Sequence, residues 1–313
     1  MDNIFDVCVL IPAYNEGSRP ILFAEEIAKE FKSVYHNIRL VIVIVDDGSI
    51  SSTTPVVNEK EHTSFELKVI KLSQNLGKDH ALFYGLSESP ESSYYCSIDA
   101  DGEQPASLLV DQWGVITTTD AQIVLARRVD PVASDGIVKR LIRRVVHSFS
   151  QRVLSVQLNG LTDCVMFDSV VARKVKINWK NNKTFKYIPW RVLYSTFFRV
   201  DDYVNFSATY KDKDGGSRFS NWRLLRLGIR CFFLNPKALT YLVYLGLLFS
   251  LFGSFVPFLF VLFDWFSGSL YPGYMTLVVL LTLILWSSLA ILSFILSRLI
   301  IEIRSIQYDL EGS

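Results

Sequence analysis

Short apolar runs rich in β-branched residues alternate with longer amphipathic stretches through the first 130 residues. The runs predicted to be buried strands are VCVLIP (7–12), LVIVIVDD (40–47), LKVIKL (67–72), YYCSID (94–99) and AQIVLA (121–126). Helices are predicted around 20–33, 53–62, 79–88 and 105–118. This alternation is typical of an α/β domain with a mainly parallel sheet. In such a sheet ligands bind beyond the carboxyl ends of the strands.

The last quarter of the chain has a different pattern. The stretches 238–263 and 265–297 contain no charged residue, and a helix needs about 20 apolar residues to cross a bilayer. We therefore predict a two-helix transmembrane hairpin with spans at about 238–263 and 275–298. A pair of buried core helices is the alternative, but such helices seldom run this long without a charge.

Basic residues flank the predicted hairpin and set its orientation. They are Arg223, Arg226, Arg230 and Lys237 before the first span, and Arg298 and Arg304 after the second. The connecting loop, DWFSGSLYPG, has neither Lys nor Arg. By the positive-inside rule both ends lie in the cytoplasm. We expect an integral membrane protein, in a bacterial inner membrane, with both termini cytoplasmic.

Two further segments are basic and amphipathic, GIVKRLIRRVVHSFSQRVLS (136–155) and FSNWRLLRLGIRCFFL (219–234). Helices of this kind lie in the membrane interface, where Lys and Arg meet anionic head groups; a solvated surface helix is the alternative. The predicted division is a cytoplasmic catalytic domain over 1–218, an amphipathic juxtamembrane helix over 219–235, and the hairpin with a short cytoplasmic tail over 236–313.

Composition removes several classes of protein. The four cysteines form no C-x-x-C pair and the four histidines no H-E-x-x-H motif, which argues against a zinc site or a disulfide framework. The N-terminal MDNIFDVCVLIP has no basic stretch before its apolar run, so it is not expected to be a signal peptide. The basic segments adjoin the membrane spans and match no nucleic-acid-binding module, so no nucleic-acid partner is expected.

The stretch DADGEQP (99–105) places two carboxylates, Asp99 and Asp101, directly after a predicted strand. Like charges this close are unfavourable unless a cation lies between them. Mg²⁺ and Mn²⁺ prefer carboxylate oxygens together with substrate phosphates. Glu103 could add a third oxygen, directly or through water. Alone, a D-x-D pair is more often a solvated turn.

Other polar motifs also follow predicted strands, and they strengthen the interpretation of Asp99 and Asp101 as a metal-binding pair. They are LIPAYNEG (10–17), VIVDDGS (43–49) and LSQNLGKDH (72–80). Taken singly, Asp46 to Ser49 would be an ordinary turn with a helix cap, and Lys78 a surface lysine.

Together and in this order, the motifs resemble the catalytic domain of glycosyltransferase family 2, which has the GT-A fold, a Rossmann-like and mainly parallel sheet. With the terminal hairpin, the chain is most similar to the polyprenyl-phosphate glycosyltransferases, the relatives of dolichol-phosphate mannose synthase and the bactoprenol glucosyltransferases. The resemblance runs from about Val7 to the end of the chain. It also implies a homo-oligomer as one arrangement in the membrane.

The resemblance implies roles for individual residues. Those implied to hold the nucleotide sugar are Pro12, Ala13, Tyr14, Glu16, Asp47, Asn75, Gly77, Lys78 and Asp99. Mg²⁺ or Mn²⁺ would be held by Asp99, Asp101 and Glu103, although relatives often carry Gln at the last position. The implied catalytic residues are Asp101 and Asp163, and whether Asp163 acts as a base or only orients stays open. The cations expected to receive the acceptor phosphate are Arg127, Arg128, Lys211, Lys213 and Arg218, with Ser217 beside them.

The expected reaction transfers one sugar from a nucleotide-diphosphate sugar to undecaprenyl or dolichyl phosphate at the cytoplasmic face. UDP is the expected nucleotide because it is more frequent than GDP in the family. The resemblance implies inversion at the anomeric carbon, and the missing Q-x-x-R-W motif of processive synthases favours a single transfer. One alternative is transfer to a lipid-linked saccharide or another hydroxyl acceptor. The other is a membrane scaffold with an inactive domain. The sequence does not name the sugar.

Overall fold

The computed structural model describes residues 4–50, 65–129, 161–181, 202–207 and 274–311, with single positions between 188 and 198 and between 240 and 268. Contacts divide the chain into two compact units, Met1–Arg226 with Ile306–Ser313, and Leu227–Ser305. The first unit holds the sheet and the helices that cover it. The second holds most of the long C-terminal helix.

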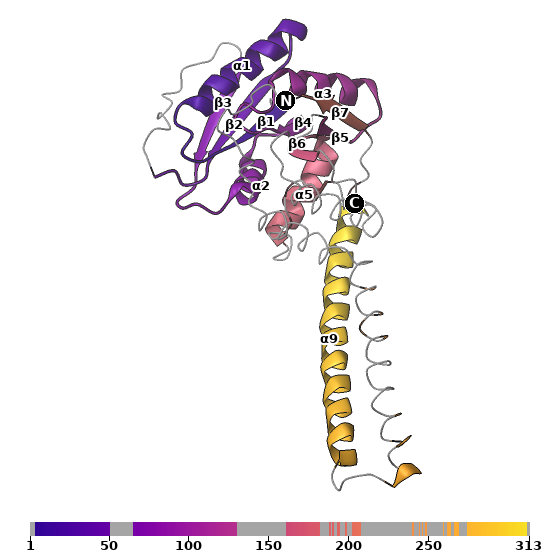
Figure 1. Ribbon diagram of the computed structural model, residues 1–313. Helices are drawn as coiled ribbons and strands as arrows, with labels where there is room; N and C mark the ends of the chain where they lie inside the picture. The colour runs from indigo at the N-terminus through magenta and orange to yellow at the C-terminus, as the bar shows by residue number, and fades with distance from the viewer. Residues whose placement is uncertain are drawn as a thin grey trace. The chain divides into compact units, whose positions relative to one another are not determined.

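A mixed sheet forms the centre of the first unit (Figure 1). Its strands are β1 (Phe5–Ala13), β2 (Leu40–Asp46), β3 (Glu66–Lys71), β4 (Ser92–Ser97), β5 (Ile123–Arg128), β6 (Leu161–Asp168) and β7 (Asp202–Phe206). Within the described residues the strand order is β3-β2-β1-β4-β6-β5-β7. Strand β6 runs antiparallel to β4 and β5, and the remaining pairs are parallel. The parallel strands therefore end at the edge where β6 begins.

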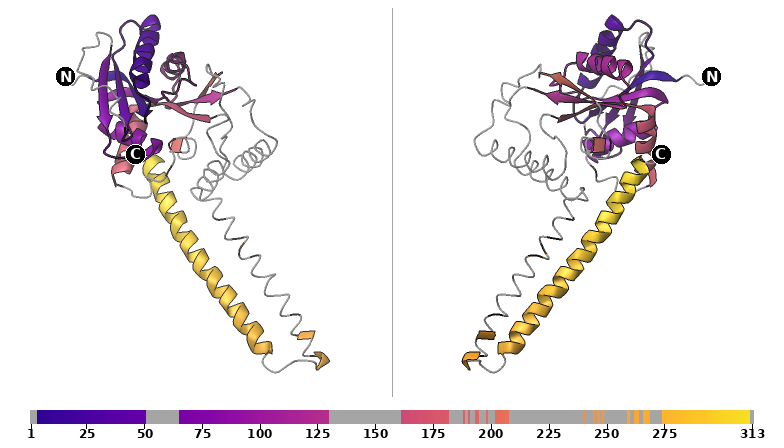
Figure 2. Two further views of the ribbon diagram at one scale, coloured as in Figure 1. Left: turned by 60° about the vertical axis from the view of Figure 1, so that its left-hand side comes forward. Right: turned by 90° about the vertical axis from the view of Figure 1, so that its right-hand side faces the viewer.

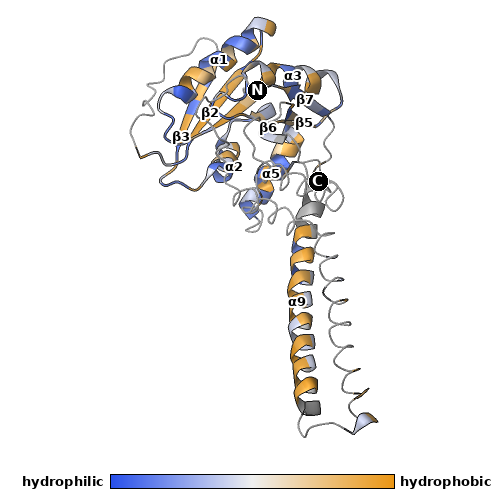
Figure 3. Cartoon of the chain, viewed as in Figure 1, coloured by the Kyte–Doolittle hydropathy of each residue, from blue (hydrophilic) through white to orange (hydrophobic). Residues whose placement is uncertain are grey.

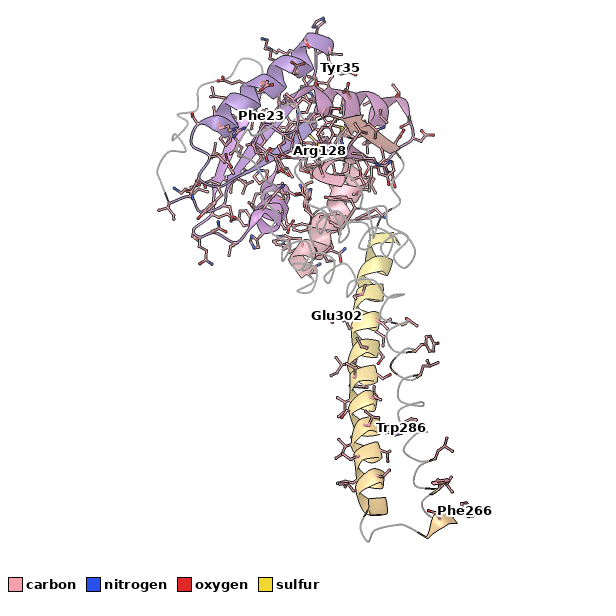
Figure 4. All side chains as sticks on the ribbon, viewed as in Figure 1. Phe23, Tyr35, Arg128, Phe266, Trp286 and Glu302 are labelled. Atoms are coloured by element: carbon pink, nitrogen blue, oxygen red, sulfur yellow. The ribbon has the colours of Figure 1, made fainter. Side chains whose placement is uncertain are left out.

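Helices cover both faces of the sheet. They are α1 (Arg19–Val34), α2 (Lys78–Glu88), α3 (Ser107–Thr118) and α5 (Ser169–Asn181). Figures 1 and 2 show α1 and α3 on one side and α2 and α5 on the other. Helix α1 buries Phe23 (labelled in Figure 4), Ile27 and Phe31, one turn apart, in one apolar cluster with Ile42 and Ile44 of β2. Because helices cover both of its faces, β2 is buried along its whole length and is apolar at every residue but the last.

The opposite face of the sheet carries an aromatic cluster. The ring of Phe83 in α2 stacks on Trp179 of α5 with centroids 4.8 Å apart, and its edge meets Trp190 at 5.0 Å. Helix α2 lies close to the sheet at Gly85, where an added Cβ would be 2.5 Å from a methyl carbon of Val45. This close packing fixes the start of α2 relative to the strand ends.

The predicted strands and three of the predicted helices are confirmed, with small shifts at their ends. The helix expected over 53–62 lies outside the described residues. A mainly parallel α/β sheet was expected, and the sheet is mixed because β6 is inserted in reverse between β4 and β5. The sequence analysis did not predict β6 or β7 as strands.

One helix long and apolar enough to cross a membrane occurs among the described residues. This helix, α9, spans Tyr274–Glu311, and its stretch Leu280–Ile303 has 24 residues with a mean hydropathy of 2.2. Figure 3 shows it as mainly hydrophobic. The helix agrees with the second predicted span. Most of the first span and the juxtamembrane segment 219–235 lie outside the described residues.

Candidate active site

The loops after β1 and β2 and the loop before α2 are joined by hydrogen bonds at the carboxyl edge of the sheet. The two carboxylate oxygens of Asp47 accept hydrogen bonds from the backbone N–H groups of Leu76 and Gly77, each at 2.8 Å. Gly48 has φ +70°, and a Cβ on it would be 2.4 Å from the carbonyl carbon of Gln74. Glycine is therefore required where these two loops meet.

A second set of hydrogen bonds ties the β1 loop to the β2 loop. The backbone N–H of Asn15 donates to the Ser49 hydroxyl at 2.8 Å, and the Asn15 side-chain oxygen accepts from the N–H of Ile50 at 3.1 Å. Asn15 has φ 55°, a left-handed conformation that asparagine tolerates. The loop tips are therefore held at a fixed spacing.

Most residues predicted to hold the nucleotide lie on these loops. Pro12 and Ala13 end β1, and Glu16 in the following loop is half-buried. Tyr14 and Asn75 are exposed. The surface that they form has aromatic, amide and carboxylate groups at the edge where ligands bind to parallel sheets.

The ammonium of Lys78 joins carboxylates from two neighbouring strands. Its Nζ lies 2.6 Å from an oxygen of Asp99, directly after β4, and 2.6 Å from an oxygen of Asp163 in β6. The Asp163 side chain is 9% exposed, that of Asp99 24% and that of Lys78 36%. The sequence analysis placed Lys78 with the nucleotide and gave Asp163 a catalytic role, and the structure brings both to Asp99.

Burial and charge act against each other in this cluster. Burial raises the pKa of Asp99, Lys78 opposes that rise, and Asp163 and Asp101 add to it. Burial alone would lower the pKa of Lys78, but the carboxylates of Asp163 and Asp99 outweigh burial and raise it. Lys78 is thus held in its charged form and supplies the positive charge that the carboxylates need.

Asp101 stands in a tight turn next to this cluster. Its Oδ1 accepts a hydrogen bond from the N–H of Glu103 at 3.0 Å, and its carbonyl oxygen accepts one from the guanidinium of Arg19 at the start of α1. Gly102 has φ +75°. The guanidinium lies so near that a Cβ on Gly102 would be 2.8 Å from it. The sequence analysis missed Arg19, which no family motif marks.

Two arginines end β5 beside the same loop. Arg128, labelled in Figure 4, forms an ion pair with Glu103 at 3.2 Å. The guanidinium of Arg127 lies over the ring of Tyr203 in β7, 4.1 Å from its centroid. Both were predicted to receive the acceptor phosphate. The structure places the guanidinium of Arg128 against the loop that carries Asp101.

A buried chain of hydrogen bonds supports Asp163 from behind. The Ser97 hydroxyl donates to the carbonyl oxygen of Asp163 at 2.6 Å and accepts from the indole N–H of Trp190 at 2.9 Å. Both Ser97 and Trp190 are buried. Sequence reasoning missed these two residues, because neither lies in a recognisable motif.

Comparison with known proteins shows the family of the chain. The sequence profile described as "Glycosyl transferase family 2" matches residues 8–199, more than half of the chain. The chain belongs to glycosyl transferase family 2. The predicted family is confirmed, and with it the predicted class of enzyme.

Relatives within glycosyl transferase family 2 cover different shares of the chain. The CsbB protein of Bacillus subtilis is 25% identical over 278 residues, 87% of this chain and 80% of that one. A dolichyl-phosphate beta-glucosyltransferase of Saccharomyces cerevisiae is 30% identical over 172 residues, about half of each chain. A bactoprenol glucosyl transferase of Shigella phage SfX is 24% identical over 227 residues, 71% of this chain and 70% of that one. The last two are named for dolichyl and bactoprenol carriers, as the predicted subgroup requires.

The residues at the family 2 D-x-D position fit a divalent cation. Asp99 and Asp101 lie two residues apart after β4, and the charge of Asp101 raises the pKa of Asp99, so the two carboxylates act on one another. Mg²⁺ is commonly held by one or two carboxylates and completes its shell with water and substrate phosphates. In the described part of the chain no group of three or more His, Cys, Asp or Glu side chains gathers as a ready-made metal site. Glu103 as a third ligand stays a prediction.

The remaining predicted acceptor residues of this family 2 protein are Lys211, Lys213, Ser217 and Arg218. All four lie outside the described residues. Their roles, and those of Arg127 and Arg128 toward a phosphate, stay predictions.

Proposed function

We propose that this protein transfers a single sugar from a nucleotide-diphosphate sugar to a polyprenyl phosphate at the cytoplasmic face of a membrane. The observation that carries the proposal is the Lys78 bridge, which holds a donor-side carboxylate, Asp99, and an acceptor-side carboxylate, Asp163, at the edge where β4 ends and β6 begins. Relatives named for dolichyl phosphate and bactoprenol support the choice of acceptor.

The nucleotide would bind over the interlocked loops after β1 and β2. Tyr14 and Asn75 offer exposed groups for the base and ribose. Asp47 keeps its carboxylate on the amides of Leu76 and Gly77, so its main contribution would be to hold the loop that leads to Lys78. A carboxylate oxygen can accept more than one hydrogen bond, so contact with the nucleotide is compatible with this role.

Asp99 and Asp101 would hold Mg²⁺ or Mn²⁺ against the diphosphate of the donor. When bound, the ion would neutralise the negative charge that grows on the leaving diphosphate. Arg19, whose guanidinium already lies on the Asp101 loop, would add positive charge on the same side. These residues would bind and orient the leaving group.

The acceptor would attack the anomeric carbon with a phosphate oxygen, and the nucleoside diphosphate would leave. A phosphate monoester has a second pKa near 6, so it is mostly a dianion at neutral pH. A strong base is therefore not required. Asp163, ion-paired with Lys78, would orient the acceptor or the sugar hydroxyls. Arg127 and Arg128, with Lys211, Lys213 and Arg218, would receive the acceptor phosphate.

The membrane would supply the acceptor. Helix α9 would form one arm of the predicted hairpin, with the catalytic domain over 1–218 and the juxtamembrane helix over 219–235 on the cytoplasmic side. A long prenyl chain could then stay in lipid while its phosphate reaches the sheet edge. This arrangement rests on hydropathy and on the positive-inside rule.

A hydroxyl acceptor is the second candidate. It would need a base to remove its proton, and Asp163 is the carboxylate placed for that purpose. An ion-paired carboxylate favours its ionised form, but an ammonium 2.6 Å from its oxygen competes for the lone pairs that would take the proton. The Lys78 contact therefore favours the phosphate acceptor.

The decisive experiment uses the full chain, purified in detergent, with polyprenyl phosphate and a panel of nucleotide sugars. UDP-glucose is the first donor to test, because the two relatives named above are glucosyltransferases. We expect a glycosylated lipid phosphate in Mg²⁺ or Mn²⁺ and loss of product in excess EDTA. Product on polyprenol or on a lipid-linked saccharide, with none on the phosphate, would overturn the proposal.

A further inference from the structure

Trp190 is a fully buried residue whose two N–H groups both donate hydrogen bonds toward the site. The indole N–H donates to the Ser97 hydroxyl at 2.9 Å, and the main-chain N–H donates to a carboxylate oxygen of Asp79 at 3.0 Å. Its exposed fraction is 0%. No family motif and none of the reaction steps above involves this residue.

Each of these partners adjoins one side of the Lys78 bridge. The Ser97 hydroxyl donates a hydrogen bond to the carbonyl oxygen of Asp163 at 2.6 Å, and Ser97 is separated from Asp99 by one residue. Asp79 directly follows Lys78 in the first turn of α2. Trp190 is thus linked to the backbone of Asp163 through one hydroxyl, and to the segment that carries Lys78 through one carboxylate.

The Ser97 contact lies where the strand pairing stops. The antiparallel register of β4 and β6 runs from Tyr94 opposite Asp168 to Ser97 opposite Val165. Asp163 lies beyond the last of these pairs, and the Ser97 hydroxyl supplies a further bond between its backbone and β4. A hydroxyl has one proton. The Ser97 hydroxyl uses that proton in its hydrogen bond to Asp163. Its oxygen accepts the hydrogen bond from the indole N–H, and the two bonds together fix the orientation of the hydroxyl.

Aromatic side chains packed around Trp190 restrict the movement of its indole ring. Its ring centroid lies 5.0 Å from that of Phe83, 5.1 Å from that of Tyr194 and 6.1 Å from that of Phe167. These rings come from α2, β6 and the segment of Trp190 itself. Aromatic packing of this kind leaves little freedom to an indole that also has its N–H bonded.

We propose that Trp190 is a positioning residue for the glycosyl transfer, acting through Ser97 to set the place of Asp163 relative to Lys78 and Asp99. The proposal rests on the proposed role of Asp163. It predicts that removal of the indole N–H slows turnover without weakening the binding of the nucleotide sugar, because the donor loops are on β1 and β2.

The test compares two conservative changes in the same aromatic cluster. Trp190→Phe keeps a ring but removes the N–H, whereas Tyr194→Phe removes a buried hydroxyl that has no hydrogen-bond partner in the described structure. We expect Trp190→Phe to lower kcat about tenfold or more, with the KM for the donor within about twofold, since small misplacements of reacting groups are costly. We expect Tyr194→Phe to change kcat by less than about twofold, since no bond is lost.

A double-mutant cycle with Asp163→Asn separates positioning from general damage. If Trp190 acts through Asp163, Trp190→Phe will lower kcat in the wild-type background and not in Asp163→Asn. An equal fall in both backgrounds, or no fall in either, would overturn the proposal. If Asp163→Asn alone keeps wild-type turnover, the proposed role of Asp163 fails instead, and the two failures are distinguished.

Ser97 provides a second route should Trp190→Phe fold poorly. Ser97→Ala removes the hydroxyl without touching the rings, and Ser97→Thr retains it. We expect Ser97→Ala to reproduce the loss of kcat and Ser97→Thr to restore most of it. Equal turnover in the two Ser97 variants would contradict the proposal.

Discussion

Two acidic clusters stand at the ends of β2 and β4, the strands on either side of β1, and are built from the same residue type, but their partners differ. At the end of β2, Asp47 gives both oxygens to backbone N–H groups, and Asp46 accepts a hydrogen bond from the N–H of Ser49 at 2.9 Å. After β4, Asp99 and its neighbour Asp163 share the ammonium of one lysine side chain. The first cluster is bonded to the fold itself, and the second to a flexible side chain.

This difference separates carboxylates that hold the loops in place from carboxylates that can bind a metal ion or a substrate. A backbone amide cannot leave its partner without unfolding the loop. A lysine side chain can rotate away and be replaced by another cation, such as a metal ion or a group on a substrate. We infer that the β2 cluster maintains the shape of the donor loops. In the β4–β6 cluster, Asp99 can exchange Lys78 for a metal ion while Asp163 keeps its ion pair with Lys78.

The largest effect is expected at Asp101. Asp101→Asn keeps an oxygen for the Glu103 N–H but removes the charge expected to hold the metal and diphosphate. Turnover should fall about a hundredfold to a thousandfold, as for loss of other groups that stabilise developing charge, in an assay with saturating Mn²⁺. Asp6→Asn is the matched control, because Asp6 pairs with Arg39 at the opposite end of β1. Near-normal turnover of Asp101→Asn would remove the metal from the proposal.

Lys78→Met tests whether the ammonium of Lys78 holds the β4–β6 cluster together. We expect turnover to fall at least about tenfold and the free energy of unfolding to fall by about 1–2 kcal/mol, a discounted value because Lys78 is partly exposed. Without Lys78, the pKa of Asp99 should rise further above its ordinary value of 3.8. A carboxyl whose folded pKa is raised loses stability as pH rises through that pKa.

The stability gap between wild type and Lys78→Met should therefore be widest near neutral pH and narrow as pH falls toward 4. Thermal unfolding of both proteins across this range measures the gap. Lys78→Arg, which keeps the charge, is the control. A gap independent of pH would show that Lys78 contributes through packing and not through charge.

The β2 cluster is tested by two glycines that both have positive φ but have different surroundings. Gly48 and Gly77 both have positive φ, but an added Cβ meets backbone atoms at 2.4 Å in the first case and nothing within 4 Å in the second. Gly77→Ala should cost about 1–3 kcal/mol of unfolding free energy from strain alone, because its φ of 94° with ψ of 153° is a region essentially limited to glycine. Gly48→Ala should cost about 1–3 kcal/mol more from overpacking, and should also raise the KM for the donor. Equal costs would mean that the two loops are not locked together.

The smallest effect is expected at Glu103. Its pairing with Arg128 has one partner more than half exposed, and such surface pairs are worth up to about 1 kcal/mol. Glu103→Gln should leave turnover, and the Mn²⁺ concentration for half-maximal turnover, within about threefold of wild type. A tenfold rise in that concentration would instead support Glu103 as a third metal ligand.

The sequence was informative wherever a signal is local. Apolar runs predicted the parallel strands, and the polar residues that follow them lie, as predicted, at the carboxyl edge of the sheet. It was uninformative about pairings between distant segments. Lys78 contacts carboxylates 21 and 85 residues away, and a chain gives no local sign of such a contact. The strand LTDCVMFD was missed because its place in the sheet depends on pairing with β4 and β5, which are distant in the sequence. Trp190 was missed because nothing in the sequence distinguishes it from other aromatic residues of the core.

The reversed strand β6 has a consequence for how proteins of this build can diversify. Strand β5 ends at the same edge of the sheet at which β6 begins, so the chain between Arg128 and Leu161 leaves and returns beside Asp163. Lengthening or exchanging the chain between those two ends would leave the register of β1, β2 and β4 untouched. A graft of this segment between relatives would therefore test whether the proposed acceptor can be changed while the loops after β1 and β2 stay as they are.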